Sequence, residues 1–418
     1  MRTSIYWFRK DLRLEDNSNL NKAIRESDAL LPVFIMEDRW SEQNPIGIPR
    51  MGDHRRAFLL ESLHELRSAL KGYGLPLIYR EGDAVTVLSG LMEETKASAI
   101  YCSKEVGTEE KAQEEALESQ FDLRTDWSQF LVHPRDLPFP LERLHHVFTR
   151  FRKAIEGKVE IRKVESLTAI DIEAVDIDPG DIPRISPAVS PDAAFRLSGG
   201  ARAGQDRIGH YLWETDDIAR YKKTRNGMLG ESFSGKFSAH LAWGCISPVQ
   251  IQAEVLRYES ERTKNESTYW MIFELLWRDF FKYVGMKHGA LLFQLRGIRD
   301  SQLQYHKHQG LFQKWIEGRT GDDFVDANMI ELKETGWMSN RGRQNVASYL
   351  CHDYQVDWRW GAWWFEHCLV DYDVTSNWGN WMYLAGVGND PRSRKFNTQK
   401  QADMYDPDGV YRQLWLRQ

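Results

Sequence analysis

The chain has 418 residues, of which 42% are hydrophobic and 28% charged, ordinary values for a globular protein with room for two or three domains. Its net charge of −6 excludes a global basic field for nucleic acid, although a local basic patch is still compatible with it. The four cysteines form no CxxC pair, so no metal site is predicted. Apolar runs are too short for a membrane span, and the N-terminus lacks a targeting signal, so we expect a cytoplasmic protein.

Residues 1–130 alternate short apolar runs with amphipathic stretches. The runs SIYWF, ALLPVFIM, LPLIYR and SAIYCS predict four buried strands. Leucines at Leu59, Leu63, Leu66 and Leu70 predict one face of a helix between the second and third strands. Alternating strands and helices predict an α/β domain with a doubly wound parallel sheet. The turn after the first strand is not GxGxxG, so no dinucleotide site is indicated there.

A connector is predicted from 131 to 198, because its second half is rich in prolines and acids that cannot continue a helix or a central strand. We expect this part to lie over the surface. From 199 to 418 the periodicity becomes helical and strand alternation disappears. The C-terminal domain is therefore predicted to be all-α.

The loop GESFSGKFS, ending at Ser238, precedes a predicted helix. Hydroxyls of Ser234 and Ser238 and backbone N–H groups suit a phosphate, and Lys236 adds a fixed positive charge. The alternative is that the serines only cap the helix.

Further along, Glu274, Trp277 and Arg278 share one face of a predicted helix. A carboxylate beside an indole suits a flat polar ligand. The alternative is a surface pair of Glu274 with Arg278, with Trp277 in the core.

The run GWMSNRGRQNVASYL places Asn340, Arg341, Arg343 and Gln344 close together, which favours anion recognition over a solvated helix face. The stretch DVTSNWGNWMYLAGVGND adds hydrogen-bonding groups after Asp371. Its glycines, Gly379, Gly386 and Gly388, would allow close approach to something flat. The neighbouring tryptophan cluster is interpreted first as core, with a redox chain as the alternative.

Taken together, these segments resemble the photolyase/cryptochrome family, and their residues are close to those of its DASH cryptochrome branch. The matching stretches are WFRKDLRLEDN, HPRDLPFP, YKKTRNGMLG, FELLWRDFF, VDANMIELKETGWMSNRGRQNVASYL, DYDVTSNWGNWMYLAGVGNDPR and YDPDG. They extend from residue 7 to 409 in the family's order, so the resemblance covers nearly the whole chain.

The resemblance implies that the helical domain binds FAD. The implied cofactor-binding residues are Tyr221, Ser234, Gly235, Lys236, Phe237, Ser238, Arg278, Arg343, Asp371, Asp373 and Asn377. Arg343 would pair with Asp371, and Asn377 would face flavin N5. The branch usually has a second serine at Gly235, and GGARAGQDR from 199 to 207 also departs from its pattern. Contacts on the phosphate side are expected to differ accordingly.

The implied reaction is that of a deoxyribodipyrimidine photo-lyase, which splits a cyclobutane pyrimidine dimer with an electron from excited reduced FAD. Glu274 would hydrogen-bond the flipped dimer, beside further DNA-binding residues at Arg225, Trp277, Asn340, Arg341, Gln344 and Tyr383. Gln344 and Tyr383 resemble the DASH branch, which prefers dimers in single-stranded or looped DNA. The alternatives are a blue-light photoreceptor without repair and a flavin-bearing nucleic-acid binding module, including one for RNA.

The family's electron-feeding chain maps onto Trp381, Trp358 and Tyr305, so its outer member is tyrosine here. Trp360 or Trp315 is an alternative outer donor. Glu105 lies in a segment similar to one that contacts a 5,10-methenyltetrahydrofolate antenna, with a deazaflavin or no antenna as alternatives. No heptad is visible, so we expect a monomer.

Overall fold

A parallel sheet forms the N-terminal part of the computed structural model, which describes residues 2–169, 171–193, 195–390 and 395–417. Its strand order is β3-β2-β1-β4-β5, and β6 pairs with the start of β2; the strands are β1 Thr3–Phe8, β2 Ala29–Glu37, β3 Ile78–Gly82, β4 Ala99–Ser103, β5 Leu123–Asp126 and β6 Glu173–Ala174. The four predicted strands are confirmed. Sequence reasoning missed β5 and β6 because both are short and neither is an apolar run.

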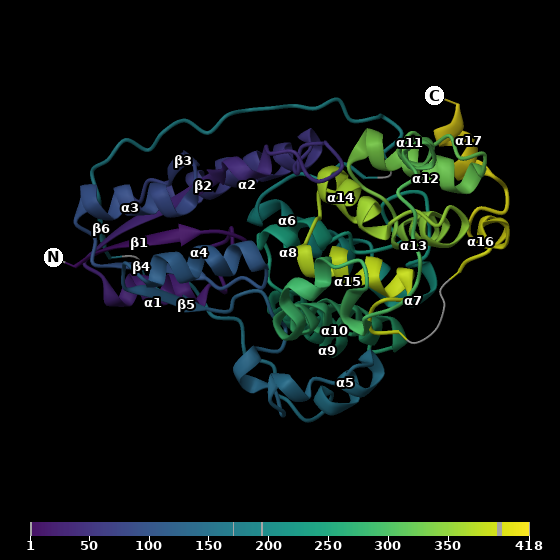
Figure 1. Ribbon diagram of the computed structural model, residues 1–418. Helices are drawn as coiled ribbons and strands as arrows, with labels where there is room; N and C mark the ends of the chain where they lie inside the picture. The colour runs from purple at the N-terminus through teal and green to yellow at the C-terminus, as the bar shows by residue number, and fades with distance from the viewer. Residues whose placement is uncertain (1, 170, 194, 391–394, 418) are drawn as a thin grey trace.

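Helices cover the sheet on both faces, as expected for a sheet whose β1, β2 and β4 are buried at every position. These helices are α1 Ser18–Glu26, α2 Asp53–Lys71, α3 Ala84–Thr95 and α4 Thr108–Glu118 (Figure 1). The predicted leucine face of α2 is buried at all four positions. The α/β class of this domain is therefore confirmed.

The C-terminal part is helical, as predicted. Its helices are α6 Ala201–Gly209, α7 Tyr221–Thr224, α8 Ser238–Trp243, α9 Pro248–Glu261, α10 Glu266–His288, α11 Gln309–Ile316, α12 Asp323–Thr335, α13 Asn340–Ser348, α14 Trp358–Cys368, α15 Val374–Ala385, α16 Thr398–Tyr405 and α17 Val410–Leu416. The long helix α10 contacts α7, α9 and α15. Elements α7, α9 and α15 therefore pack on α10. Among the described helices none is long and apolar enough to cross a membrane.

The chain between the two parts includes α5 Phe148–Ile155, which packs against α10. The proline-rich stretch that follows runs as a long irregular trace over the sheet domain (Figure 1). The N–H of Tyr79 in β3 donates to the carbonyl of Pro179 at 2.8 Å, so this stretch is hydrogen-bonded to the edge strand of the sheet.

The glycines near the C-terminus do not have the role that the sequence suggested. A Cβ at Gly379 would lie 2.3 Å from the ring of Phe281, so this glycine allows α15 to pack closely on α10. Gly386 ends α15 with a φ of +77°. A Cβ at Gly388 would collide with the backbone of Met382. The flat group that approaches Gly379 is therefore the ring of Phe281, and none of the three glycines is among the residues that line the two cavities described below. The Pro391 and Arg392 end of the matching stretch lies outside the described residues.

Candidate functional site

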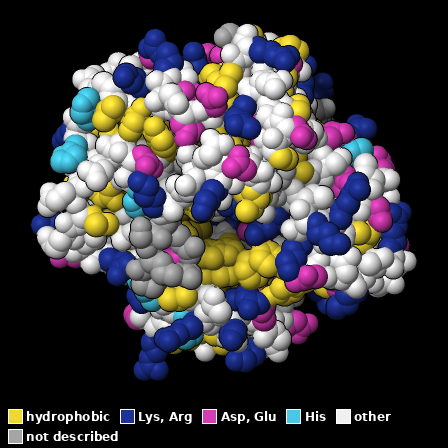
Figure 2. Space-filling model, turned by 90° about the vertical axis from the view of Figure 1, so that its right-hand side faces the viewer, with side chains coloured by type: hydrophobic (Ala, Val, Ile, Leu, Met, Phe, Trp, Pro, Cys, Tyr) yellow, Lys and Arg dark blue, Asp and Glu magenta, His cyan; other side chains and the backbone are white. Residues whose placement is uncertain are grey.

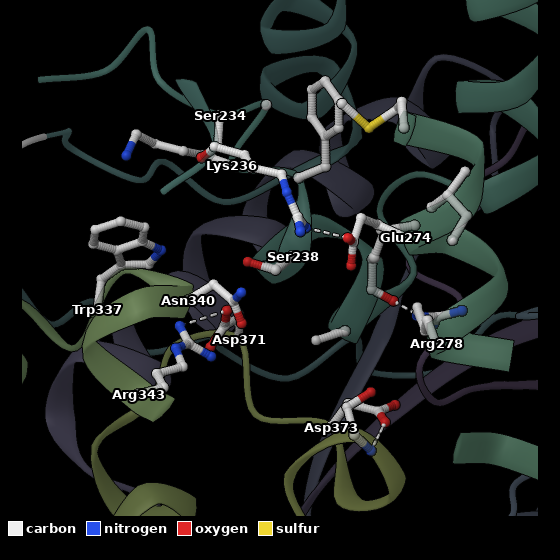
Figure 3. A pocket seen from close by; sticks show the side chains of 18 of the residues that line it. Ser234, Lys236, Ser238, Glu274, Arg278, Trp337, Asn340, Arg343, Asp371 and Asp373 are labelled. Carbon is white, nitrogen blue, oxygen red and sulfur yellow. Dashed lines mark hydrogen bonds and ion pairs between the residues drawn. The ribbon is translucent and has the colours of Figure 1, made fainter. Parts of the chain in front are cut away.

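A cavity of about 300 Å³ opens in the helical part, between the loop before α8, α10 and the start of α13 (Figure 3). It brings together most of the residues that the sequence singled out: Tyr221, Arg225, Ser234, Gly235, Lys236, Phe237, Ser238, Glu274, Arg278, Asn340, Arg343, Asp371 and Asp373. A second cavity of about 120 Å³ adjoins it and adds Gln344, Asn377 and Trp381. The two share Asn340, Arg343, Asp371, Asp373 and Ser376 in their walls, so they lie side by side.

The loop before α8 and the first residue of that helix contribute Ser234 and Ser238 to the lining of this space. Phe237, not a serine, is the N-cap of α8, and no side chain caps that helix end. The capping interpretation of the serines is therefore wrong. The loop is held from behind by Arg207, whose Nε donates to the carbonyl of Gly235 at 3.0 Å and whose Nη2 donates to that of Glu231 at 2.8 Å. Arg207 lies in the GGARAGQDR segment, and sequence reasoning did not assign it a role.

Lys236 lines the cavity but turns its ammonium group against two aromatic rings. Nζ lies 3.7 Å from the ring centroid of Phe233 and 4.0 Å from that of Trp337 (Figure 3). It has no hydrogen-bond partner among the described residues. Burial lowers the pKa of Lys236 to about 7, so its charge is not fixed near neutral pH, contrary to the sequence expectation.

Arg343 and Asp371 form an ion pair on the opposite wall. Nη2 lies 2.9 Å from Oδ2, and the Nε of Arg343 donates to the carbonyl of Met338 at 2.9 Å. The other oxygen, Asp371 Oδ1, is buried and has no partner among the described residues. A buried acceptor without a donor is costly, so this atom is suited to a hydroxyl group of a ligand.

Asp373 forms a second buried ion pair, with Lys282 of α10. Lys282 Nζ lies 2.9 Å from Asp373 Oδ2, while Asp373 Oδ1 accepts from the N–H of Ser376 at 2.8 Å. Burial opposes the charge, but Lys282, Arg278 and Lys10 together hold the pKa of Asp373 well below its usual range. Sequence reasoning missed Lys282. The available signal was a lysine within the apolar part of α10, four residues after Arg278.

Glu274 pairs with Arg225 of the chain just after α7, not with Arg278. The predicted alternative of a Glu274 and Arg278 surface pair is therefore wrong. Arg278 instead donates to the carbonyls of Gln129 and Leu241. Burial raises the pKa of Glu274, and Arg225 offsets this only in part. The carboxyl group faces the cavity (Figure 3).

Asn377 lies in the second cavity with its amide already oriented. Nδ2 donates to the carbonyl of Ala362 at 3.0 Å. The carbonyl oxygen of the amide remains able to accept a hydrogen bond from a ligand.

The three residues of the expected electron chain belong to one hydrophobic cluster, which contains Trp381 and Trp358 and against which Tyr305 packs. Trp381 lines the second cavity, Trp358 is buried and 5.7 Å from Trp378 in ring-centroid distance, and Tyr305 is partly exposed and donates to the carbonyl of Ala385. A separate series of ring contacts leads from Trp381 to the surface, with centroid distances of 6.1 Å to Trp315, 5.9 Å on to Phe312 and 5.2 Å on to the partly exposed Trp360.

Three predicted DNA-binding residues lie outside both cavities. Trp277 stacks on Phe148, with centroids 3.7 Å apart, and meets Tyr383 edge-on at 6.0 Å. Arg341 donates to Asn226 Oδ1 at 3.1 Å. No carboxylate pairs with Arg341 among the described residues, which leaves its charge available to an anion.

A third cavity, of about 280 Å³, lies between the sheet domain and the helical domain. Its wall includes Trp40, Glu109, Glu110 and Trp363, but not Glu105. Arg39 pairs with Glu109 at 2.7 Å and with Glu110 at 3.1 Å, so the positive charge of Arg39 is already neutralised. Glu105 is buried, and its carboxylate accepts a hydrogen bond from Gln129 Nε2 at 3.1 Å.

Comparisons with known proteins agree with this arrangement. Residues 4–170 match the family described as DNA photolyase, and residues 270–418 match the FAD binding domain of DNA photolyase. Cryptochrome DASH of Xenopus laevis is 44% identical, with 99% of this chain and 82% of that protein covered. Cryptochrome DASH of Synechocystis sp. is 43% identical, with 99% and 87% covered.

The solved structures show the same fold. The crystal structure of a Synechocystis cryptochrome superimposes with a TM-score of 0.96 at 41% identity and covers 100% of this chain and 89% of its own. A class III photolyase from Agrobacterium tumefaciens has a TM-score of 0.84 at 27% identity, with 100% and 87% covered. The sheet domain, the helical FAD-binding domain and the relatives named Cryptochrome DASH lead to one conclusion: this chain belongs to the photolyase/cryptochrome family.

Proposed function

We propose that this protein is a light-driven lyase that splits cyclobutane pyrimidine dimers, preferentially in single-stranded or looped DNA. The observation that carries the proposal is the lining of the first cavity, because that one space is bordered both by most of the predicted cofactor-binding residues and by Glu274. The lesion and the cofactor can lie within contact distance only in such a space.

The residues of the cavity fit FAD, the cofactor of this family's helical domain. The free hydroxyls of Ser234 and Ser238 can donate to a diphosphate, and Asp371 Oδ1 supplies the acceptor that a ribose or ribityl hydroxyl needs. A diphosphate near Lys236 would also favour the protonated form of that lysine. When bound and reduced, FAD supplies the single electron that opens the cyclobutane ring after excitation by blue light.

Asn377 would hydrogen-bond the flavin ring at N5. Ala362 takes one of the two Nδ2 hydrogens, so the second hydrogen and the carbonyl oxygen of the amide can still act toward a ligand. Both roles that the sequence left open, donor to an anionic ring and acceptor from a protonated N5, therefore stay open.

The lesion would enter beside Glu274, Asn340 and Gln344. A dimer is flipped at lower cost than an intact base because it is already poorly stacked. Glu274 has a hydrogen-bonding carboxyl group inside the cavity, kept in place by Arg225. Burial raises the pKa of Glu274 while Arg225 lowers it, and the carboxyl oxygens can accept hydrogen bonds from N–H groups of the dimer.

Photoreduction of the cofactor would begin at Trp381, which lines the cavity. We propose that the electron is supplied through Trp358 and Tyr305, with the ring series ending at Trp360 as the competing route. Transient absorption distinguishes them, because a tyrosyl radical and a tryptophanyl radical absorb at different wavelengths. A tryptophanyl radical that persists in the wild type and disappears in Trp360→Phe would assign the second route.

The antenna proposal is a folate in the cavity between the domains, with Glu109 and Glu110 rather than Glu105 on its wall. The folate released on unfolding measures this directly. A protein that retains FAD but binds no added 5,10-methenyltetrahydrofolate would contradict it. We also propose a monomer in the cytoplasm.

The experiment that tests the function compares blue-light repair of a thymine dimer in matched single-stranded and duplex oligonucleotides. The protein is reduced chemically and kept anaerobic, so that photoreduction does not limit the result. Repair confined to the single strand is expected. No repair in either substrate, with reduced FAD bound, would favour the photoreceptor.

Glu274→Ala tests the assignment of the lesion site. Losing a hydrogen bond to a charged or strongly polar group costs about 1.5–3 kcal/mol, so repair should fall roughly 10- to 150-fold while flavin reduction continues. Glu261→Ala, an exposed glutamate at the end of α9, is the matched control and should repair normally. Unchanged repair in Glu274→Ala would overturn the assignment.

A further inference from the structure

An aromatic strip runs along the solvent side of α10 and away from the lesion cavity. Tyr269, Trp270, Phe273 and Trp277 are all at least partly exposed, although aromatic rings on a helix normally face the core. Trp270 lies 4.3 Å from Phe273 in centroid distance. Their spacing of three and four residues places them on one face of the helix.

The strip continues beyond α10 through two other segments. Phe148 of α5 lies 5.2 Å from Phe273 and stacks on Trp277 at 3.7 Å with an interplanar angle of 13°. Tyr383 of α15 then meets Trp277 edge-on. Rings from three separate elements therefore form one series of contacts. Figure 2 shows hydrophobic side chains gathered in a hollow on this side of the molecule, with lysines and arginines around it.

Cations lie directly on the strip. The guanidinium of Arg225 lies 4.6 Å from the ring centroid of Trp270, and Lys222 Nζ lies 5.2 Å from it. Arg152 lies 5.4 Å from the ring of Phe273. Their carboxylate partners are Glu274, Glu266 and Glu156 respectively.

Two further cations are sequence neighbours of residues on the strip. Lys223 follows Lys222 on α7, and Arg150 is on α5 two residues after Phe148; both are exposed. Neither has a carboxylate partner within the part of the chain that the structure describes. Their charges are therefore available to phosphates.

We propose that this strip binds the undamaged single-stranded nucleotides next to the dimer, with bases against Trp270 and phosphates near Lys222 and Lys223. Aromatic rings interleaved with cations suit single-stranded nucleic acid, because every base has a face that can stack. A duplex buries those faces, so the strip gains nothing from it. The inference rests on the proposed function, since it extends the lesion site through Arg225, which contacts both Trp270 and Glu274.

Two substrates separate the strip from the lesion pocket. A thymine dimer dinucleotide occupies only the pocket, whereas a longer single-stranded oligonucleotide with the same dimer also reaches the strip. Trp270→Ala should weaken binding of the oligonucleotide about tenfold and leave repair of saturating dinucleotide unchanged. Trp270→Phe keeps a flat ring and should retain most of the affinity. Flavin content confirms that each variant is folded.

A loss of dinucleotide repair equal to the loss of oligonucleotide binding would overturn the proposal, because Trp270 would then act only through Arg225 and Glu274. Unchanged oligonucleotide affinity would also overturn it. If the wild type repairs nothing, the proposed function fails, but binding of an undamaged oligonucleotide still tests the strip. Lys223→Gln should lower the salt dependence of that binding by about one unit of slope.

Discussion

The cavity proposed for FAD and the cavity between the domains are similar in size but differ in how their charged groups are paired. In the first, Asp371 Oδ1 and Lys236 Nζ are buried without hydrogen-bond partners among the described residues. In the second, Arg39 and Arg50 lie against carboxylates on both sides, and only the Nε of Arg55 is buried without a partner among the described residues that line it. The first site therefore leaves an acceptor and an ammonium group for a ligand, whereas the second pairs two of its cations within the protein.

This difference indicates which site is specified more strongly. Unsatisfied buried groups favour a ligand that supplies the missing partners, because leaving them unpaired costs about 1–3 kcal/mol each. A cavity whose charges are already paired recognises its ligand mainly by shape, and it must give up existing contacts to do more. We therefore expect tight binding of FAD and weaker binding of any antenna.

The largest effect should come from breaking the buried pair beneath the FAD site. Lys282→Met removes the ion-pair partner of the buried Asp373, leaving only the attraction of Arg278 and Lys10, and should destabilise the protein by about 3–5 kcal/mol, measured by urea unfolding. The double variant Lys282→Met with Asp373→Asn removes that charge and should recover much of the loss. A single variant as stable as the wild type would show that water reaches Asp373.

The pH dependence of the unfolding free energy tests the burial of Glu105. Burial raises the pKa of Glu105 to about 7 from an ordinary 4.5, against the attraction of Lys10 and Arg9. The folded state therefore binds a proton that the unfolded state releases, and this stabilisation is complete below pH 4.5 and is lost as pH rises through 7.

Glu105→Gln removes the titration. Relative to the wild type, it should gain roughly 3 kcal/mol of unfolding free energy between about pH 4 and about pH 8. Parallel stability curves for the two proteins would contradict the raised pKa.

The smallest effect is expected in the cavity between the domains. The side chain of Glu109 is 50% exposed, so its pairs with Arg39 and Arg50 are screened by solvent. Glu109→Ala should change the unfolding free energy by less than about 1 kcal/mol. A loss comparable with that of Lys282→Met would remove the distinction between the two cavities.

The sequence predicted secondary-structure elements and site motifs better than it predicted which side chains pair with each other. The buried strands followed from apolar runs, and most polar residues that line the proposed FAD cavity lie in four short segments that the sequence singled out. The family resemblance correctly predicted one pair across the chain, Arg343 with Asp371, but residue patterns alone predicted none. Glu274 was compared with Arg278, four residues away, but its partner is Arg225, 49 residues away.

Lys282 and Arg207 were missed for the same reason. Helical periodicity indicates which residues share a face, but not what lies opposite that face. Gly379 illustrates this limit: its lack of a side chain was visible in the sequence, but only the fold shows that the neighbouring ring is Phe281.

The segment around Gln129 joins the two domains in a way that bears on how the protein melts. The backbone N–H groups of Leu131 and Val132 donate to Asp279 at 3.1 and 2.8 Å, and Gln129 bonds to Lys282 at 3.0 Å. These bonds attach the segment that follows the sheet domain to α10, which lines the proposed FAD cavity. Loss of FAD would therefore lower the melting temperature of both domains together, as one cooperative transition rather than two.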